Sequence, residues 1–181
     1  MKKYIIASIV GMGIISGTST ACISVAHAAN NNEVTFLGAV NAQTCNLSTS
    51  VNGTAQPNQV VQLGTVQVGQ TSSPVIFAMT PTNPTDPGCV VMKTKTITVS
   101  WASSALNTTG FGATSGTATD AVVLVNSVNA KKSGAVNANA STVEFDGAKL
   151  ATEGLKFNAS LKGGTIEGNF KSVASFAVAY K

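Results

Sequence analysis

The stretch Val34-Thr35-Phe36-Leu37-Gly38-Ala39-Val40-Asn41-Ala42 sets the question for the whole chain. Taken at every second position, it presents an apolar face that lacks a side chain at its centre. That face consists of Val34, Phe36, Gly38, Val40 and Ala42. This alternation is typical of a β-strand with one buried face. The strand therefore needs a sheet, which belongs either to this molecule, with the stretch as an ordinary first strand, or to a neighbouring one.

The first 28 residues predict a signal peptide. Met1-Lys2-Lys3 is a short positive segment, and the mostly apolar residues 4–15 are too few to span a bilayer. Ala26-His27-Ala28 has the small-residue pattern of a cleavage site, which places cleavage after Ala28. Two alternatives are an uncleaved anchor helix and a lipoprotein acylated at Cys22, although the residues before Cys22 lack the expected leucine-like residue.

Cleavage at that point would change the set of reactive side chains. It would remove Cys22 and His27, the only histidine, and leave Cys45 and Cys89 as the cysteines of the mature chain. Two cysteines in an exported protein most simply form one disulfide, with two free thiols as the alternative. We therefore expect a Cys45–Cys89 disulfide.

The composition predicts an all-β protein. Small, β-branched and turn-forming residues dominate, and charged residues make up only 10% of the chain. There is no arginine and only one tryptophan, so we expect no nucleic-acid partner. About 150 residues remain after cleavage, which suffices for one domain with its own core.

Short strands separated by turns are expected along the mature chain. The clearest lies at residues 94–102, where Ile97, Val99 and Trp101 share one face. A largely apolar run at 121–128 is interpreted as a core strand, with a short helix as the alternative. The other expected strands lie at residues 34–47, 60–68, 74–79, 142–145, 155–162 and 170–180, with turns or loops at 48–58, 81–88, 107–119 and 130–141 and no helix after the signal. The pattern predicts an immunoglobulin-like antiparallel β-sandwich.

Enzyme chemistry finds little support in the sequence. Without a histidine, histidine-based catalysis and histidine-ligated metal sites are excluded for the mature chain, and no metal or cofactor is expected. The usual serine-nucleophile and phosphate-binding motifs are missing. Glu144 and Asp146 would share a face of a strand, where a glycosidase pair is formally possible, but a solvated edge pair is the simpler interpretation. We therefore expect no enzymatic activity.

The carboxyl-terminal run, residues 170–180, is a strand at the very end of the chain. Ala174, Phe176, Val178 and Tyr180 lie on one of its faces. A seven-stranded sandwich would follow this strand with one more, whereas an amphipathic strand without a partner stands at the other end of the chain.

With both ends considered together, the sequence resembles the major subunits of type 1-like fimbriae, the pilins assembled by the chaperone–usher route. Residues 34–40 are similar to the family's amino-terminal extension, hydrophobic–x–aromatic–x–Gly–x–hydrophobic, shortly before a first cysteine. Val61-Gln62-Leu63-Gly64 resembles the strand that follows that cysteine, and Cys89 stands in place of the second. Gly168 is fourteenth from the end and Tyr180 is penultimate, as in the family. The resemblance covers the mature chain, although residues 101–157 match only in style.

The resemblance implies an incomplete immunoglobulin-like sandwich of six strands, with a groove where the seventh is missing. A periplasmic chaperone fills the groove with one of its own strands, and at the outer-membrane usher the extension of the next subunit replaces it. The expected organisation is a signal peptide at 1–28, a donor-strand extension at 29–43 and a pilin domain at 44–181. Gly38 would fit where the groove is shallow, and Phe36, Val40 and Ala42 would fill pockets.

The same resemblance assigns roles at the other end of the chain. Phe176, Val178 and Tyr180 would line the groove or contact the chaperone, and Gly168 would belong to the same region. The alternatives are a plain turn glycine at 168 and a surface aromatic at 180. The expected function is a structural subunit that passes through the periplasm to a cell-surface fimbrium, polymerises head to tail with neighbouring subunits and supports adhesion to host cells.

An alternative function is a major subunit that itself binds host glycans. Trp101 and the loop near Phe111 would offer an aromatic ring for stacking, and Lys131 and Lys132 would supply cations. The same loops are equally consistent with solvated surface.

Overall fold

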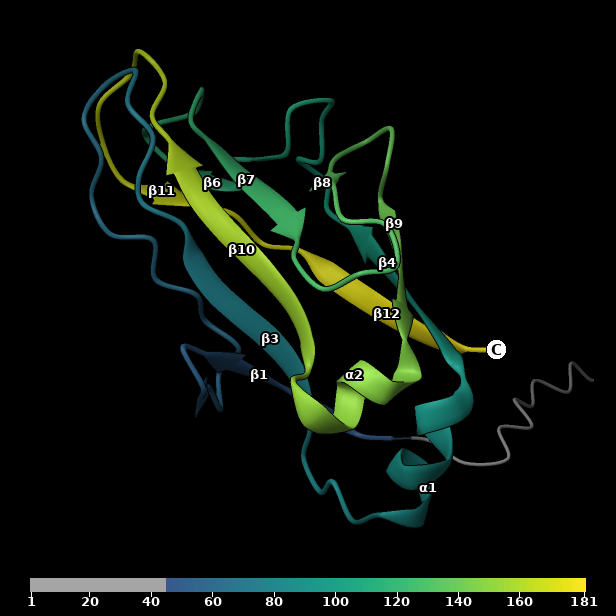
Figure 1. Cartoon of the computed structure of the whole chain (residues 1–181). Coiled ribbons are helices and arrows are strands. Elements are labelled where there is room, and N and C mark those ends of the chain that lie inside the picture. The colour runs from purple at the N-terminus through teal and green to yellow at the C-terminus, as the bar shows by residue number, and fades with distance from the viewer. Residues whose placement is uncertain (1–44) are drawn as a thin grey trace, which may run out of the picture. The chain divides into compact units, whose positions relative to one another are not determined.

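Two antiparallel sheets face each other in the computed structural model, which describes residues 45–181 (Figure 1). The larger sheet has the strand order β2-β1-β3-β10-β7-β5, with β8 paired to β7. Its strands are β1 (Leu47–Val51), β2 (Thr54–Ala55), β3 (Val75–Pro81), β5 (Phe111–Gly112), β7 (Val122–Ser127), β8 (Ala135–Val136) and β10 (Leu155–Lys162).

The smaller sheet has the order β12-β4-β9, so β4 lies in its centre. β4 spans Thr96–Ala102, β9 spans Thr142–Asp146 and β12 spans Ser175–Tyr180. A separate two-stranded sheet joins β6 (Ser115–Gly116) to β11 (Phe170–Lys171). The predicted fold class, an antiparallel immunoglobulin-like sandwich, is confirmed. In the smaller sheet, β9 pairs with the edge of β4 that lies opposite to β12.

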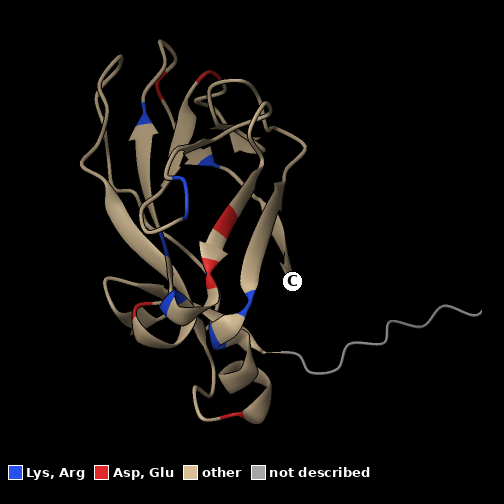
Figure 2. Ribbon diagram, turned by 45° about the vertical axis from the view of Figure 1, so that its right-hand side comes forward, with Lys and Arg blue, Asp and Glu red and all other residues tan. Residues whose placement is uncertain are grey.

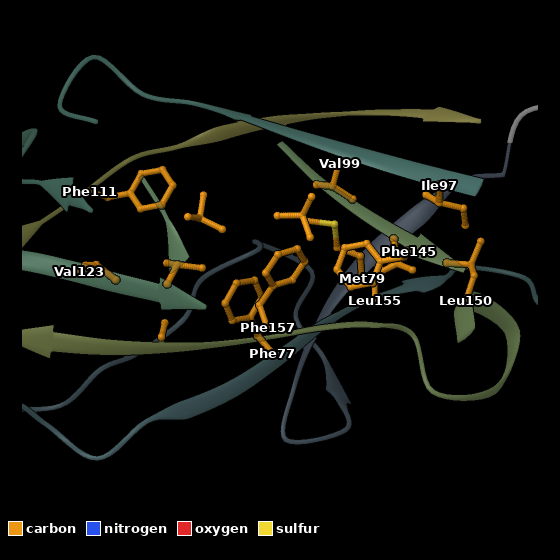
Figure 3. Close-up of a cluster of buried hydrophobic side chains, with 14 of the residues drawn as sticks. Phe77, Met79, Ile97, Val99, Phe111, Val123, Phe145, Leu150, Leu155 and Phe157 are labelled. Atoms are coloured by element: carbon orange, nitrogen blue, oxygen red, sulfur yellow. The ribbon is translucent and has the colours of Figure 1, made fainter. Parts of the chain in front are cut away.

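The core lies between the sheets and is built from side chains at alternating strand positions. In β4, Ile97 and Val99 are 0% exposed, and in β10 alternate residues are buried along the whole strand. Phe157 stands at the centre of an aromatic cluster, with its ring centroid 5.4 Å from Phe77 and 5.3 Å from Phe145 (Figure 3). Because Phe77 and Phe157 come from the larger sheet and Phe145 from the smaller one, these rings join the two layers.

Three short helices were not expected from the sequence: α1 (Pro87–Val90), the 3-10 helix η1 (Val91–Thr94) and α2 (Gly147–Thr152). Asp86 and Asp146 begin the two α-helices, because each carboxylate accepts a hydrogen bond from the backbone N–H two residues later. Such helices are too short for an apolar periodicity, which is why strand and loop patterns concealed them.

Several predicted boundaries change in the structure. The expected turn at 48–58 contains β1 and β2, joined by an Asn52-Gly53 turn in which both residues have positive φ. The expected strand at 60–68 is irregular and pairs with no other strand of the described chain. The carboxyl-terminal run divides into β11 and β12. The segment at 121–128 is a strand, β7, with every second residue buried, so the helical alternative is wrong.

The predictions for residues 1–28 and for the stretch 34–42 lie outside the described residues. Within residues 45–181, no helix is long and apolar enough to cross a membrane, and no group of histidine, cysteine, aspartate or glutamate side chains could hold a metal ion. Charged residues are scattered over this part of the chain (Figure 2).

Candidate site: an open strand edge and the pocket at its end

The last strand, β12, has one open edge. Thr96 and Lys181 exchange two backbone hydrogen bonds of 2.9 Å. This pair fixes which residues of β12 direct their main-chain groups toward β4 and which direct them away from it. In an antiparallel pair every second residue directs its N–H and C=O away from the partner strand. Here these residues are Phe176, Val178 and Tyr180. Within the described chain their main-chain groups have no partner, so β12 presents three donors and three acceptors to a further strand. We call this row the acceptor edge.

The side chains of the same three residues point inward but are incompletely covered. Phe176, Val178 and Tyr180 pack against the hydrophobic core, yet each remains half-buried. Their neighbours on β4, Ile97 and Val99, are fully buried. The difference arises because β4 is flanked by two strands of its sheet and β12 by one. Apolar surface is therefore left open along the acceptor edge.

Within the described chain, the irregular segment at residues 60–66 also combines incompletely covered apolar side chains with main chain that has no hydrogen-bond partner. Val61, Leu63 and Val66 are half-buried and pack against the core. After Leu63, the spacing between inward-facing side chains increases from two residues to three. Gly64 adopts a φ of +73°, which turns the side chain of Thr65 outward. Within the described chain, residues 60–66 make no backbone hydrogen bond. This segment is a second length of main chain without a partner.

A pocket of about 770 Å³ connects the segment at 60–68 to the approach to β12. We call it the terminal pocket. Its lining includes Val66, Leu161, Gly168 and Phe170, and Phe170 lies in β11, directly before β12 in the chain. Gly168 therefore lies in this pocket, with a φ of +141°. The sequence pointed to Gly168 only through its distance from the end of the chain, and it did not single out the pocket.

The other end of the acceptor edge is tied to the first described residue. The Tyr180 hydroxyl donates a hydrogen bond of 3.2 Å to the carbonyl oxygen of Cys45. Burial raises the pKa of Tyr180 above its usual value, so the hydroxyl keeps its proton at neutral pH. The predicted disulfide is confirmed, because Cys45 is bonded to Cys89 of α1. Cys45, the first described residue, therefore lies beside the carboxyl end of β12.

The side chains considered for glycan binding do not present an open ring. Phe111 is only 3% exposed, and Trp101 faces the interior with its ring 5.4 Å from Phe157 and 5.5 Å from Phe176. The Lys131 ammonium donates a hydrogen bond of 2.6 Å to the Thr96 hydroxyl. Phe111 belongs to the core and Trp101 packs against it, so the described chain offers no exposed aromatic ring at these two positions.

The acidic pair on β9 also has a structural explanation. Glu144 and Asp146 share the exposed face of this edge strand, as predicted. Asp146 is the amino-terminal cap of α2, where it accepts a hydrogen bond from Ala148. The pair therefore matches the interpretation as surface carboxylates.

Together, these features define a subunit with an immunoglobulin-like sandwich whose last strand has an open edge and incompletely covered apolar side chains. Over 182 residues, which span the whole of both chains, the sequence is 38% identical to an F107 fimbrial protein of Escherichia coli. The chain therefore belongs to the fimbrial proteins, among the type 1-like fimbrial subunits that its motifs indicated. It is a structural subunit of a surface fimbrium, in a family of structural subunits rather than enzymes.

Two further comparisons complete this result. The crystal structure of the P pilus rod subunit PapA aligns with 82% of this chain and 100% of its own, at 17% identity and a TM-score of 0.46. No protein-family model matches the sequence. The family assignment rests on the full-length relative.

Replacing Gly168 by alanine is expected to destabilise the domain by about 2 kcal/mol, because a residue with a side chain is strained at this positive φ. A Cβ atom at this position would also overlap Thr117, whose hydroxyl accepts a hydrogen bond from the Asn169 N–H. Urea unfolding measures the loss. Gly134 has no atom within 4 Å of an added Cβ, so Gly134→Ala is the matched control and should change the free energy of unfolding by less than about 1 kcal/mol. Equal effects of the two substitutions would contradict the prediction.

Proposed function

We propose that this subunit polymerises by donor-strand exchange, with residues 34–42 of one molecule completing the sandwich of the next. The observation that carries the proposal is the acceptor edge, where unpaired main chain and uncovered apolar side chains occur on the same three residues, Phe176, Val178 and Tyr180. An added strand would satisfy the main-chain groups and cover the side chains in one step. The stretch 34–42 has the complementary pattern, with one apolar face at period two.

The donor is proposed to run antiparallel to β12. Cys45, which follows each molecule's own stretch in the sequence, lies beside Tyr180 and does not line the terminal pocket. An antiparallel donor would bring the next domain to the pocket end of the acceptor edge, so that domains follow one another head to tail. A parallel donor would instead crowd two Cys45 ends together. A head-to-tail contact that does not close produces a filament.

The sizes of the side chains favour one register for this antiparallel donor. Gly38 would lie opposite Phe176, whose large ring packs on Trp101 and leaves least room. Phe36 would then lie opposite Val178, a smaller residue. Nine residues of strand extend roughly 30 Å, beyond the six residues of β12, so Val40 would reach the terminal pocket.

The same edge explains the need for helper proteins before assembly. An unpaired strand edge with apolar side chains is an aggregation hazard. In the periplasm, a chaperone would cover the acceptor edge with a strand of its own, and the outer-membrane usher would exchange that strand for the donor of the incoming subunit. The assembled fimbrium would support adhesion to host cells.

Substituting Val178 by proline tests the acceptor edge directly. The Val178 N–H points away from β4, so proline would remove a donor from the open edge without breaking the β4–β12 ladder, a position where proline is tolerated. We expect uptake of a synthetic peptide of residues 29–44 by the chaperone-bound subunit to slow by at least about tenfold, since a hydrogen bond and the space for the donor are both lost. Release of the chaperone on native gels measures the rate.

Val178→Ala is the matched control, because it shortens the same side chain and keeps the N–H. Its uptake of the peptide should stay within about threefold of the wild type, a difference of less than 1 kcal/mol. If proline and alanine slow the exchange equally, the open main-chain edge is not what receives the donor, and the proposal is wrong.

A further inference from the structure

Asp120 lies behind one wall of the terminal pocket and binds the turn that forms this wall. One oxygen of its carboxylate accepts hydrogen bonds from the Thr165 N–H at 2.6 Å and from the Thr165 hydroxyl at 2.7 Å. The other oxygen accepts a bond of 3.2 Å from the Ile166 N–H. The two residues that make these bonds stand 45 and 46 positions away in the chain, so no local pattern in the sequence indicated them.

The turn also holds the opposite wall of the pocket. The Gly69 N–H donates a bond of 2.9 Å to the Gly164 carbonyl, and the Gly163 N–H donates a bond of 2.8 Å to the Gln70 carbonyl. A Cβ atom on Gly164 would overlap the Asp120 carboxylate. The turn at 163–166 is thus fixed between Asp120 on one side and the segment at 67–70 on the other.

All three segments of this junction contribute to the terminal pocket, but Asp120 itself does not line it. The pocket is lined by Ala118 and Ala121 on either side of Asp120, by Gly163, Gly164 and Ile166 of the turn, and by residues 64–68 of the opposite segment. Asp120 would therefore not touch a donor strand. It acts through the walls of the pocket.

We propose that Asp120 is a positioning residue that holds the terminal pocket in the shape that receives Val40 of the incoming donor strand. This inference rests on the proposed donor-strand function and on its register. A pocket whose walls are already fixed loses less conformational freedom when the donor enters, so exchange is faster. The hydrogen bonds from Thr165 also hold the pKa of Asp120 below its ordinary value, so the carboxylate remains ionised at neutral pH.

The test compares Asp120→Asn with Glu144→Gln in the full subunit bound to its chaperone. Asparagine keeps the shape of the side chain but places an amide donor against a backbone N–H or the hydroxyl. Glu144 lies on the exposed face of β9 and does not line the terminal pocket, and no hydrogen bond to its carboxylate occurs in the described chain, so Glu144→Gln removes the same charge and leaves the junction intact. Two synthetic peptides of residues 29–44 are used as donors, one with the natural sequence and one with Val40→Ala.

For the wild-type subunit, we expect the Val40→Ala peptide to exchange about tenfold more slowly than the natural peptide. The alanine lacks two methyl groups of valine and leaves their space in the pocket unfilled. Asp120→Asn should slow the natural peptide by about tenfold and reduce the ratio between the two peptides to about twofold. Glu144→Gln should preserve both the rate and the ratio. A loss of overall stability alone would slow both peptides alike and leave the ratio unchanged.

If Asp120→Asn retains the wild-type ratio, Asp120 does not position the pocket, and the inference is overturned while donor-strand exchange stands. If the wild-type subunit takes up neither peptide, it is the proposed function that fails. Should Asp120→Asn not fold, Thr165→Val removes one of the three bonds and keeps the size of the side chain. It should slow the natural peptide by about threefold and lower the ratio, and an unchanged ratio would again overturn the inference.

Discussion

Deleting residues 29–42 is expected to abolish fibres completely. The shortened subunit keeps β1 to β12 and both cysteines, so it should still fold with the chaperone on its acceptor edge. It would have no strand to offer the next molecule. Electron microscopy of cells that produce the shortened chain with its chaperone and usher should show no fimbriae, and fibres from these cells would refute donor-strand exchange.

Removing only residues 29–33 is the matched control. This shorter deletion also changes the amino terminus but leaves the stretch 34–42 intact, so fibres should still form. A second arm supplies the missing strand in solution. A synthetic peptide of residues 29–44 should bind the shortened subunit and stabilise it by about 4 kcal/mol at a thousandfold excess over its dissociation constant. The single tryptophan, Trp101, packs on Phe176 and provides a fluorescence signal for this binding.

Replacing Cys45 and Cys89 together by serine is expected to cost about 4 kcal/mol of unfolding free energy, because the bond closes a loop of 44 residues in sequence. Domains of this size are stable by only about 5–15 kcal/mol, and this one lacks a strand until it is assembled. The variant should therefore unfold at much lower urea concentration than the wild type, when both are saturated with donor peptide. Circular dichroism during the titration measures the midpoint.

Cys22→Ser is the control for this experiment, because Cys22 lies in the predicted signal peptide and would be absent from the mature chain. It should leave the urea midpoint unchanged. A loss of less than about 1 kcal/mol in the double serine variant would contradict the prediction. It would mean that the Tyr180–Cys45 hydrogen bond and the packing of α1 hold this end of the domain without the covalent bond.

The long regular strands could be predicted from the sequence because their signal is local. Alternation along β4, β7 and β10 follows from one buried and one exposed face, and this pattern appears in the sequence itself. The three short helices and the hairpin of β1 and β2 could not be located in this way. Capping and turn residues decide such elements over a few positions, where an apolar period cannot develop.

The segment at 60–66 shows where local reasoning fails. Val61 and Leu63 alternate as in a strand, but a strand needs a hydrogen-bonded neighbour, and the described chain supplies none. Gly64 at positive φ then interrupts the alternation. The prediction of a strand at 60–68 is therefore wrong, although Val61 and Leu63 do pack against the core.

The sequence by itself determined the class of protein: a small, all-β, disulfide-linked chain whose motifs identify a fimbrial subunit. These properties depend on composition, on short local patterns and on the positions of these patterns along the chain. The family resemblance pointed to Phe176, Val178 and Tyr180, but only the tertiary structure decided which other groups surround them. The open edge of β12, the terminal pocket and the Asp120 junction each join segments that are tens of residues apart. Long-range strand pairing and loop packing bring these segments together, and no local pattern encodes either.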